Sequence, residues 1–147
     1  MKAKVAATLV AAPLLAFASH VFAASPVGTW VTIDDATKKP KSVVQISEAG
    51  GVLSGKVIKV LQSDKGPNPV CEACTGADKN KPIEGLTIVK GVKKNGKVYD
   101  GGTIMDPKSG KVYSVKMTPS ADGKTMQVRG FMGVSLLGRT QVWQRQN

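Results

Sequence analysis

Residues 86–105 read LTIVKGVKKNGKVYDGGTIM, two β-rich runs on either side of Asn95-Gly96. Asn-Gly readily takes the positive φ values of a tight turn, so this stretch predicts a β-hairpin with a type I′ turn. Leu, Ile, Val and Tyr fill the two runs, which are expected to form strands at residues 86–92 and 98–105. The same pattern of β-rich runs and polar turns extends in both directions from this hairpin.

Short β-rich runs recur about every ten residues, a spacing typical of a β-sandwich or barrel. Polar turns separate them, and no long segment has helical periodicity. We therefore predict an all-β fold with eight strands, at residues 30–34, 43–46, 52–61, 86–92, 98–105, 112–117, 125–131 and 139–145. Strands joined by tight turns form a meander. Closing the last strand onto the first gives an antiparallel up-and-down β-barrel without exposed edges.

The first 23 residues have the features of a secretory signal peptide. Lys2 and Lys4 precede an apolar run that is too short to cross a bilayer as a helix. Val21-Phe22-Ala23 supplies a small-residue cleavage pattern, so we expect cleavage after Ala23. The product is expected to be one domain of residues 24–147, periplasmic or secreted.

Cleavage changes the chemistry that the chain can offer. His20, the only histidine, is removed with two of the 21 basic residues, and all ten acidic residues stay, so the net charge becomes 19 − 10 = +9. A histidine base and a His-ligated metal are thereby excluded. The lysines are spread over turns and strand faces, as is common in β proteins. Together with export, this spread argues against nucleic acid as a partner and leaves an anionic envelope surface as an alternative.

Two cysteines lie in the longest connection, residues 62–85. In an oxidising compartment Cys71 and Cys74 are expected to form a disulfide that staples this loop. Long loops over a barrel end often act as lids or binding loops. Thiol redox chemistry would need a helix N-terminus or nearby cations, and the acidic Glu72 disfavours a thiolate. A structural staple is therefore the expected role.

The carboxylates offer little for catalysis. Asp34-Asp35, Asp100, Asp106 and Asp122 all fall at strand ends or in turns, where turn chemistry explains them. Ser135 lacks a nucleophile elbow and a histidine partner. We expect no enzyme activity, no cofactor and no metal, with thiol redox chemistry or a carboxylate hydrolase as the enzymatic alternatives.

The first predicted strand contains a tryptophan, and the last contains an arginine. Gly28-Thr29-Trp30 opens the first strand, and Arg139 lies on the last. The arrangement resembles that of lipocalins and their relatives, in which an arginine packs over the first-strand tryptophan as a cation–π contact. We therefore expect Trp30 and Arg139 to form a barrel-closing pair.

The chain also resembles a family of secreted bacterial proteins known as domain of unknown function 2147. The resemblance runs from Gly28 through Arg145. It rests on these stretches: Gly28-Thr29-Trp30-Val31-Thr32, Cys71-x-x-Cys74-x-Gly76, Met105-Asp106-Pro107 with Gly110-Lys111-x-Tyr113, Val128-Arg129-Gly130-Phe131, and Leu137-Gly138-Arg139-Thr140-Gln141-x-Trp143. It implies a lipocalin-like, calycin-type barrel and brings no established activity.

The expected function is binding of a small apolar or amphipathic molecule inside the barrel. Strand alternation predicts its lining side chains, namely Val44, Ile46, Tyr113, Val115, Met126 and Val128. Small barrels can instead be filled by their own side chains. The protein would then be an envelope interaction module or a homodimer that uses its basic loops and the apolar stretch 130–138. That stretch is expected either to plug the barrel or to form an exposed interface.

Overall fold

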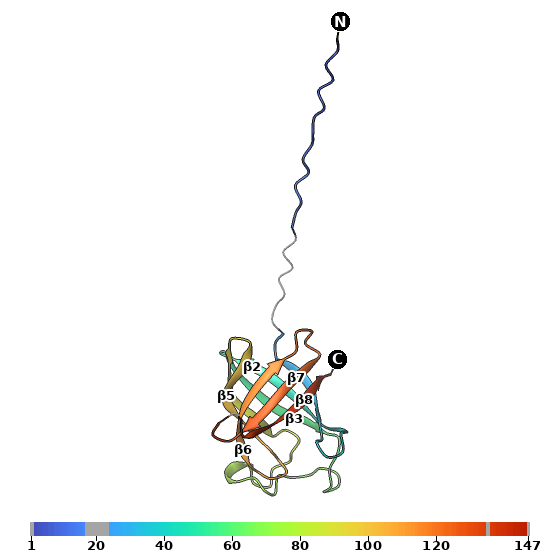
Figure 1. The fold of residues 1–147 in the computed structure, drawn as a ribbon. Helices are drawn as coiled ribbons and strands as arrows, with labels where there is room; N and C mark the ends of the chain where they lie inside the picture. The colour runs from blue at the N-terminus through green and yellow to red at the C-terminus, as the bar shows by residue number, and fades with distance from the viewer. Residues whose placement is uncertain (1, 17–23, 135, 147) are drawn as a thin grey trace.

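The structure is a computed structural model, and it describes residues 2–16, 24–134 and 136–146. Eight antiparallel strands close into a barrel in which sequential strands are neighbours and the last pairs with the first (Figure 1). The predicted all-β, eight-stranded antiparallel barrel is confirmed. The strands are β1 (Gly28–Ile33), β2 (Pro40–Ala49), β3 (Val52–Val60), β4 (Thr87–Asn95), β5 (Val98–Met105), β6 (Val112–Pro119), β7 (Thr125–Phe131) and β8 (Gly138–Arg145). A short 3₁₀ helix, η1 (Gly76–Asp78), lies between β3 and β4.

The hairpin between β4 and β5 forms as expected, but its turn is displaced by one residue. Asn95 pairs with Val98, so the two loop residues are Gly96 and Lys97. Of these two, Gly96 has a positive φ of 65°. One positive φ, at the first loop position, fits a type II′ turn, so the predicted type I′ turn was wrong.

The up-and-down topology divides the turns between two ends of the barrel. One end, which we call the N-terminal end, carries the start of β1, the β2–β3, β4–β5 and β6–β7 turns, and the end of β8. The other, the loop end, carries the β1–β2 turn, the long connection 61–86, the β5–β6 turn and the β7–β8 hairpin. We call residues 61–86 the Cys loop. Figure 1 shows this loop in green at the base of the barrel.

Apolar side chains pack the middle of the barrel. Trp30, Trp143, Leu53 and Met117 are each no more than 1% exposed. Gly55 shows how dense the packing is, because a Cβ added there would lie 2.8 Å from Cδ1 of Ile46. The predicted lining residues Val44, Ile46, Val115, Met126 and Val128 are all buried in this core, and Tyr113 is half-buried.

The N-terminal end is closed by Trp30 and Arg145. The Arg145 guanidinium lies 4.2 Å from the Trp30 ring centroid, whereas Arg139 pairs with Asp35 at the loop end. The predicted pair of Trp30 and Arg139 was therefore wrong in its arginine. The physical reason is strand direction: β8 is antiparallel to β1, so the end of β8 meets the start of β1.

Residues 2–16 have no regular secondary structure, are exposed, and extend away from the barrel in Figure 1. The predicted cleavage site at Val21-Phe22-Ala23, and His20, lie outside the described residues. Among the described residues, no helix is long and apolar enough to cross a membrane.

Candidate binding site at the loop end of the barrel

On β6 and β8 the interior-facing side chains become progressively more exposed toward the loop end. Trp143, Gln141 and Arg139 lie on one face of β8, because side chains alternate along a strand. Trp143 is 1% exposed, Gln141 is half-buried, and the Arg139 side chain is 70% exposed. On β6, Val115 is buried and Tyr113, the next residue on the same face, is half-buried. Solvent therefore reaches the inner face of the barrel beside β6 and β8.

Gly130 on β7 leaves this inner face free of a side chain. A Cβ added to Gly130 would lie 3.5 Å from Cβ of Tyr113 and 3.7 Å from Cγ2 of Ile104, which is ordinary contact distance. Gly130 also pairs with Arg139 across the β7–β8 ladder. We call these neighbouring residues, Ile104, Tyr113, Gly130, Arg139 and Gln141, the mouth.

A chain of polar contacts runs from the core to the rim of the mouth. The Trp143 indole donates from Nε1 to Oε1 of Gln141 at 3.2 Å, and Nε2 of Gln141 donates to Oδ2 of Asp35 at 3.0 Å. Arg139 Nε lies 2.9 Å from the same Asp35 oxygen. Because an indole nitrogen only donates, Trp143 fixes which way the Gln141 amide points. The carboxylate of Asp35 is thus held by two residues of β8.

Asp35 lies near the junction of β1 and β8, where few residues of the two strands are paired. Within the described residues the β1–β8 ladder contains two pairs, Trp30 with Arg145 and Val31 with Gln144. The β7–β8 ladder, by comparison, continues to Phe131 and Gly138 at the loop end. Side chains therefore join β8 to the β1–β2 turn near the mouth, where the backbone ladder has ended.

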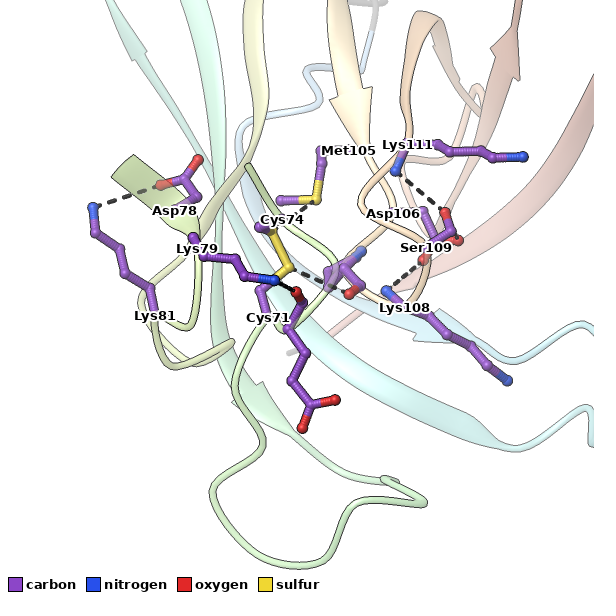
Figure 2. Close-up of a disulfide and its surroundings, with 12 residues drawn as sticks. Cys71, Cys74, Asp78, Lys79, Lys81, Met105, Asp106, Lys108, Ser109 and Lys111 are labelled. Atoms are coloured by element: carbon purple, nitrogen blue, oxygen red, sulfur yellow. Dashed lines mark hydrogen bonds and ion pairs between the residues drawn. A yellow bond between two sulfur atoms is a disulfide. The ribbon is translucent and has the colours of Figure 1, made fainter. Parts of the chain in front are cut away.

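The Cys loop covers another part of the loop end. Cys71 and Cys74 form a disulfide, and both side chains are buried. Figure 2 shows the bridge beside the β5–β6 turn. Cys74 Sγ lies 3.8 Å from Met105 Sδ, and Cys71 Sγ lies 3.4 Å from the Pro107 carbonyl oxygen. A Cβ added to Gly110 would collide with the carbonyl of Ala73. The bridge thus packs the loop directly onto this turn.

Backbone hydrogen bonds hold the Cys loop in shape. Cys71 N donates to Lys81 O at 2.8 Å, and Asn80 N donates to Cys71 O at 2.9 Å. The loop returns to the barrel where Gly85 N donates to Val57 O at 2.7 Å and Leu86 is buried. The Cys loop is therefore held against the loop end of the barrel by backbone hydrogen bonds, and the disulfide cross-links two of its residues.

The β7–β8 hairpin is the most exposed apolar feature at this end. Leu136 is 88% exposed, Leu137 71%, Val134 60% and Met132 53%. The alternative in which this stretch plugs the barrel is therefore wrong for these four residues, because they point to solvent.

Two carboxylates with lowered pKa values, those of Asp34 and Asp122, lie in separate turns. Asp34 accepts backbone hydrogen bonds from Thr37 and Ala36 in the β1–β2 turn, and these bonds, that of Thr37 first, hold its pKa below the ordinary value. At the N-terminal end, the Ser120 hydroxyl lowers the pKa of Asp122, with help from the Lys124 backbone. Both groups serve as turn caps in this structure.

Among the hollows of the barrel surface are two to which the predicted lining residues do not contribute. One lies beside the Cys loop, between Asp78, Lys81, Glu84 and Lys90. The other lies at the N-terminal end around Ser25 and Arg145. The six residues predicted to line a ligand belong instead to the core and, for Tyr113, to the mouth.

A family model of uncharacterized proteins conserved in bacteria (DUF2147) matches residues 28–145, from the first residue of β1 to the last of β8. The chain belongs to this family. The stretches by which it resembles the family lie mainly at the loop end, in the Cys loop, the β5–β6 turn and the adjoining ends of β7 and β8.

No curated protein matches the chain. Among solved structures it is similar to protein HP1028 from Helicobacter pylori, which is described as belonging to the lipocalin family. The two are 19% identical, 84% of each chain is covered, and the TM-score is 0.73. At this identity the likeness is one of fold, and it shows that the barrel is lipocalin-like.

Proposed function

We propose that this protein is an exported binding protein that holds one small amphipathic molecule at the mouth of its barrel. The observation that carries the proposal is the change in burial along the inner face. Trp143 and Val115 are buried, whereas Gln141 and Tyr113, the next residues outward on their strands, are half-buried. A ligand seated at the mouth would cover side chains that the fold itself leaves partly in water.

The chemistry of the mouth supports an amphipathic ligand. Ile104 and Tyr113 offer apolar surface, and Gln141 and Arg139 offer polar groups on the neighbouring strand. Such a mixture of apolar surface and a few placed polar groups is typical of small-molecule sites. Because the tryptophans fill the middle of the barrel, the ligand is expected to bind at the outer half.

Export is supported by two separate features. Lys2 and Lys4 with the apolar run that follows them have the pattern of a signal peptide. The disulfide between Cys71 and Cys74 fits an oxidising compartment. We therefore place the ligand-binding step in the periplasm or outside the cell.

Native mass spectrometry of the mature protein, gently purified from the periplasm of its own host, tests the proposal. We expect an added mass of one small molecule that is lost on denaturation. A homogeneous unliganded protein would contradict the proposal.

The exposed β7–β8 hairpin favours a second candidate, an interaction module that pairs with another copy of the chain through Leu136 and Leu137. The same mass spectra distinguish the two. Unliganded dimers that become monomers in a Leu136→Ser, Leu137→Ser variant would support this second candidate.

A further inference from the structure

We infer that the ligand of the mouth carries an anionic head group, a carboxylate or a phosphate, and that Arg139 binds it. This inference rests on the proposed function, because it names the chemical class of the molecule held at the mouth. It follows from three observations: the hydrogen-bond donors that Arg139 has available, the net charge around it, and the apolar surface beside it.

Arg139 is held in place through one nitrogen. Its Nε lies 2.9 Å from Oδ2 of Asp35, and the side chain is 70% exposed. Among the contacts of the described residues, neither terminal nitrogen of Arg139 has a partner. A guanidinium presents five N–H donors in a planar fork that matches a carboxylate or phosphate. Arg139 therefore offers donors to an incoming anion while Asp35 fixes its position.

Arg145 lies on the same face of β8, but its guanidinium nitrogens all have hydrogen-bond partners. Its Nε donates to Gly123 O at 2.6 Å, Nη1 to Val27 O at 2.9 Å and Nη2 to Ser25 O at 2.6 Å. All three of its nitrogens are used by the backbone, and its face is covered by Trp30. Arg145 is thus committed to closing the barrel, whereas Arg139 is available at the open end.

The position of Arg139 is supported from inside the barrel. Asp35 also accepts from Gln141 at 3.0 Å, and Gln141 is oriented by the Trp143 indole. Fixing the counter-ion in this way reduces the conformational freedom that Arg139 must lose on binding. The rim is thereby organised for a head group before a ligand arrives.

The charge around the mouth favours an anion even though Asp35 is itself negative. Residues 34–41, which are the β1–β2 turn and the first two residues of β2, contain together with Arg139 four cations: Lys38, Lys39, Lys41 and Arg139. They contain two carboxylates, Asp34 and Asp35, so the local balance is 4 − 2 = +2. A net positive rim attracts an anionic ligand and raises its local concentration.

Apolar surface to which the tail of such a ligand could bind lies directly beside Arg139. Gly130 pairs with Arg139, and its inner face lies against Tyr113 and Ile104. A molecule whose head is bound by Arg139 can therefore place its tail over Gly130 onto these two side chains. The expected ligand class is an anionic amphiphile.

Three probes with the same twelve-carbon chain test this inference: dodecanoate, dodecanol and dodecyltrimethylammonium, the two ionic probes used below their micelle concentrations and dodecanol below its solubility limit. Binding to the mature protein is followed by calorimetry and by tryptophan fluorescence. We expect dodecanoate to bind about tenfold more tightly than dodecanol, as one charge-assisted bidentate contact would provide. Dodecyltrimethylammonium is expected to bind more weakly than dodecanol.

The variant Arg139→Gln is expected to remove the tenfold preference for dodecanoate, because it weakens the binding of dodecanoate far more than that of dodecanol. Lys111→Gln, an exposed cation at the same end but on the β5–β6 turn, is the matched control and is expected to keep the preference. Thermal unfolding checks the fold of both variants, which is expected to persist because the ion pair of Arg139 is largely exposed.

The outcomes separate the inference from the function on which it rests. Equal affinity for dodecanoate and dodecanol, or a preference that survives Arg139→Gln, would overturn the inference and leave a binding barrel in place. If none of the three probes binds and the protein from its own host is unliganded, the proposed function fails as well.

Discussion

The guanidinium of Arg145 lies 4.2 Å from the centroid of the Trp30 indole and joins the last residue of β8 to the first strand. The same indole donates from Nε1 to the carbonyl of Pro26 at 2.8 Å. The N-terminal end is therefore closed by one buried aromatic residue, with an arginine on its face and a backbone carbonyl at its edge. At the loop end, by contrast, the inner face beside β6 and β8 is partly exposed.

Arg145→Met is expected to destabilise the protein strongly. The change removes the cation from Trp30 and leaves three backbone carbonyls without their donors, so we expect a loss of about 3 kcal/mol in the free energy of unfolding. Arg139→Gln breaks an exposed pair and is expected to cost less than about 0.5 kcal/mol. Urea unfolding of both variants measures the difference, and equal losses would contradict the assignment of Arg145 as the closing arginine.

Gly110→Ala is expected to loosen the Cys loop. Gly110 has a φ of 69°, and an added Cβ would collide with the backbone of Ala73. Gly133 has a φ of 67°, and no atom of a described residue lies within 4 Å of an added Cβ, so Gly133→Ala measures the cost of the backbone conformation. We expect that cost to be about 1 kcal/mol, and Gly110→Ala to lose about 1–3 kcal/mol more from the collision.

Hydrogen exchange locates this effect. Amides of residues 70–81 are expected to exchange faster in Gly110→Ala than in Gly133→Ala. Unchanged protection of the loop in both variants would show that the loop does not depend on its contact with the β5–β6 turn.

Removing the disulfide is expected to have a moderate effect on stability. The bridge between Cys71 and Cys74 closes a short loop, for which loop-closure entropy gives about 2 kcal/mol. The double change Cys71→Ala, Cys74→Ala tests this without leaving buried hydroxyl groups. Denaturant unfolding with and without reductant measures the loss, and a reductant effect that persisted in the double variant would rule out the bridge as its source.

Stability is expected to be nearly constant from about pH 5 to pH 8, because the chain after Ala23 has no histidine. Asp34 and Asp122 have folded pKa values below their ordinary value of 3.8, so they favour the folded state when ionised. This contribution is complete above about pH 4 to 5 and is lost as the pH falls through the folded pKa values. Asp34→Asn with Asp122→Asn keeps an acceptor in each turn and is expected to flatten the acid limb of the unfolding curve. An acid limb as steep as that of the unchanged protein would assign the loss to other carboxylates.

The sequence predicted the strands well because their signals are local. Turn residues such as Asn95-Gly96 and Gly50-Gly51 mark hairpins regardless of what surrounds them. The closing arginine was missed although a signal existed. With eight antiparallel strands, the last residues of β8 must meet the first of β1, and this geometry favours Arg145 over Arg139.

The mouth could not have been assembled from the sequence. Asp35 and Gln141 are 106 positions apart, and their contact depends on the register of β8 and on the early end of the β1–β8 ladder. Of the six predicted lining residues, Tyr113 lies at the mouth and the other five are buried in the core. Strand alternation predicts which side chains point inward, but it does not predict where along the strand the packed core ends.

The most direct test of the mouth as the binding site compares Gly130→Leu with Gln127→Leu by native mass spectrometry of protein purified from its own host. A side chain at position 130 would extend over Tyr113 and Ile104, whereas position 127 is exposed on the outer face of the same strand. The account predicts that Gln127→Leu retains the bound molecule and that Gly130→Leu loses it while remaining folded. Full retention of the bound molecule in folded Gly130→Leu would contradict it.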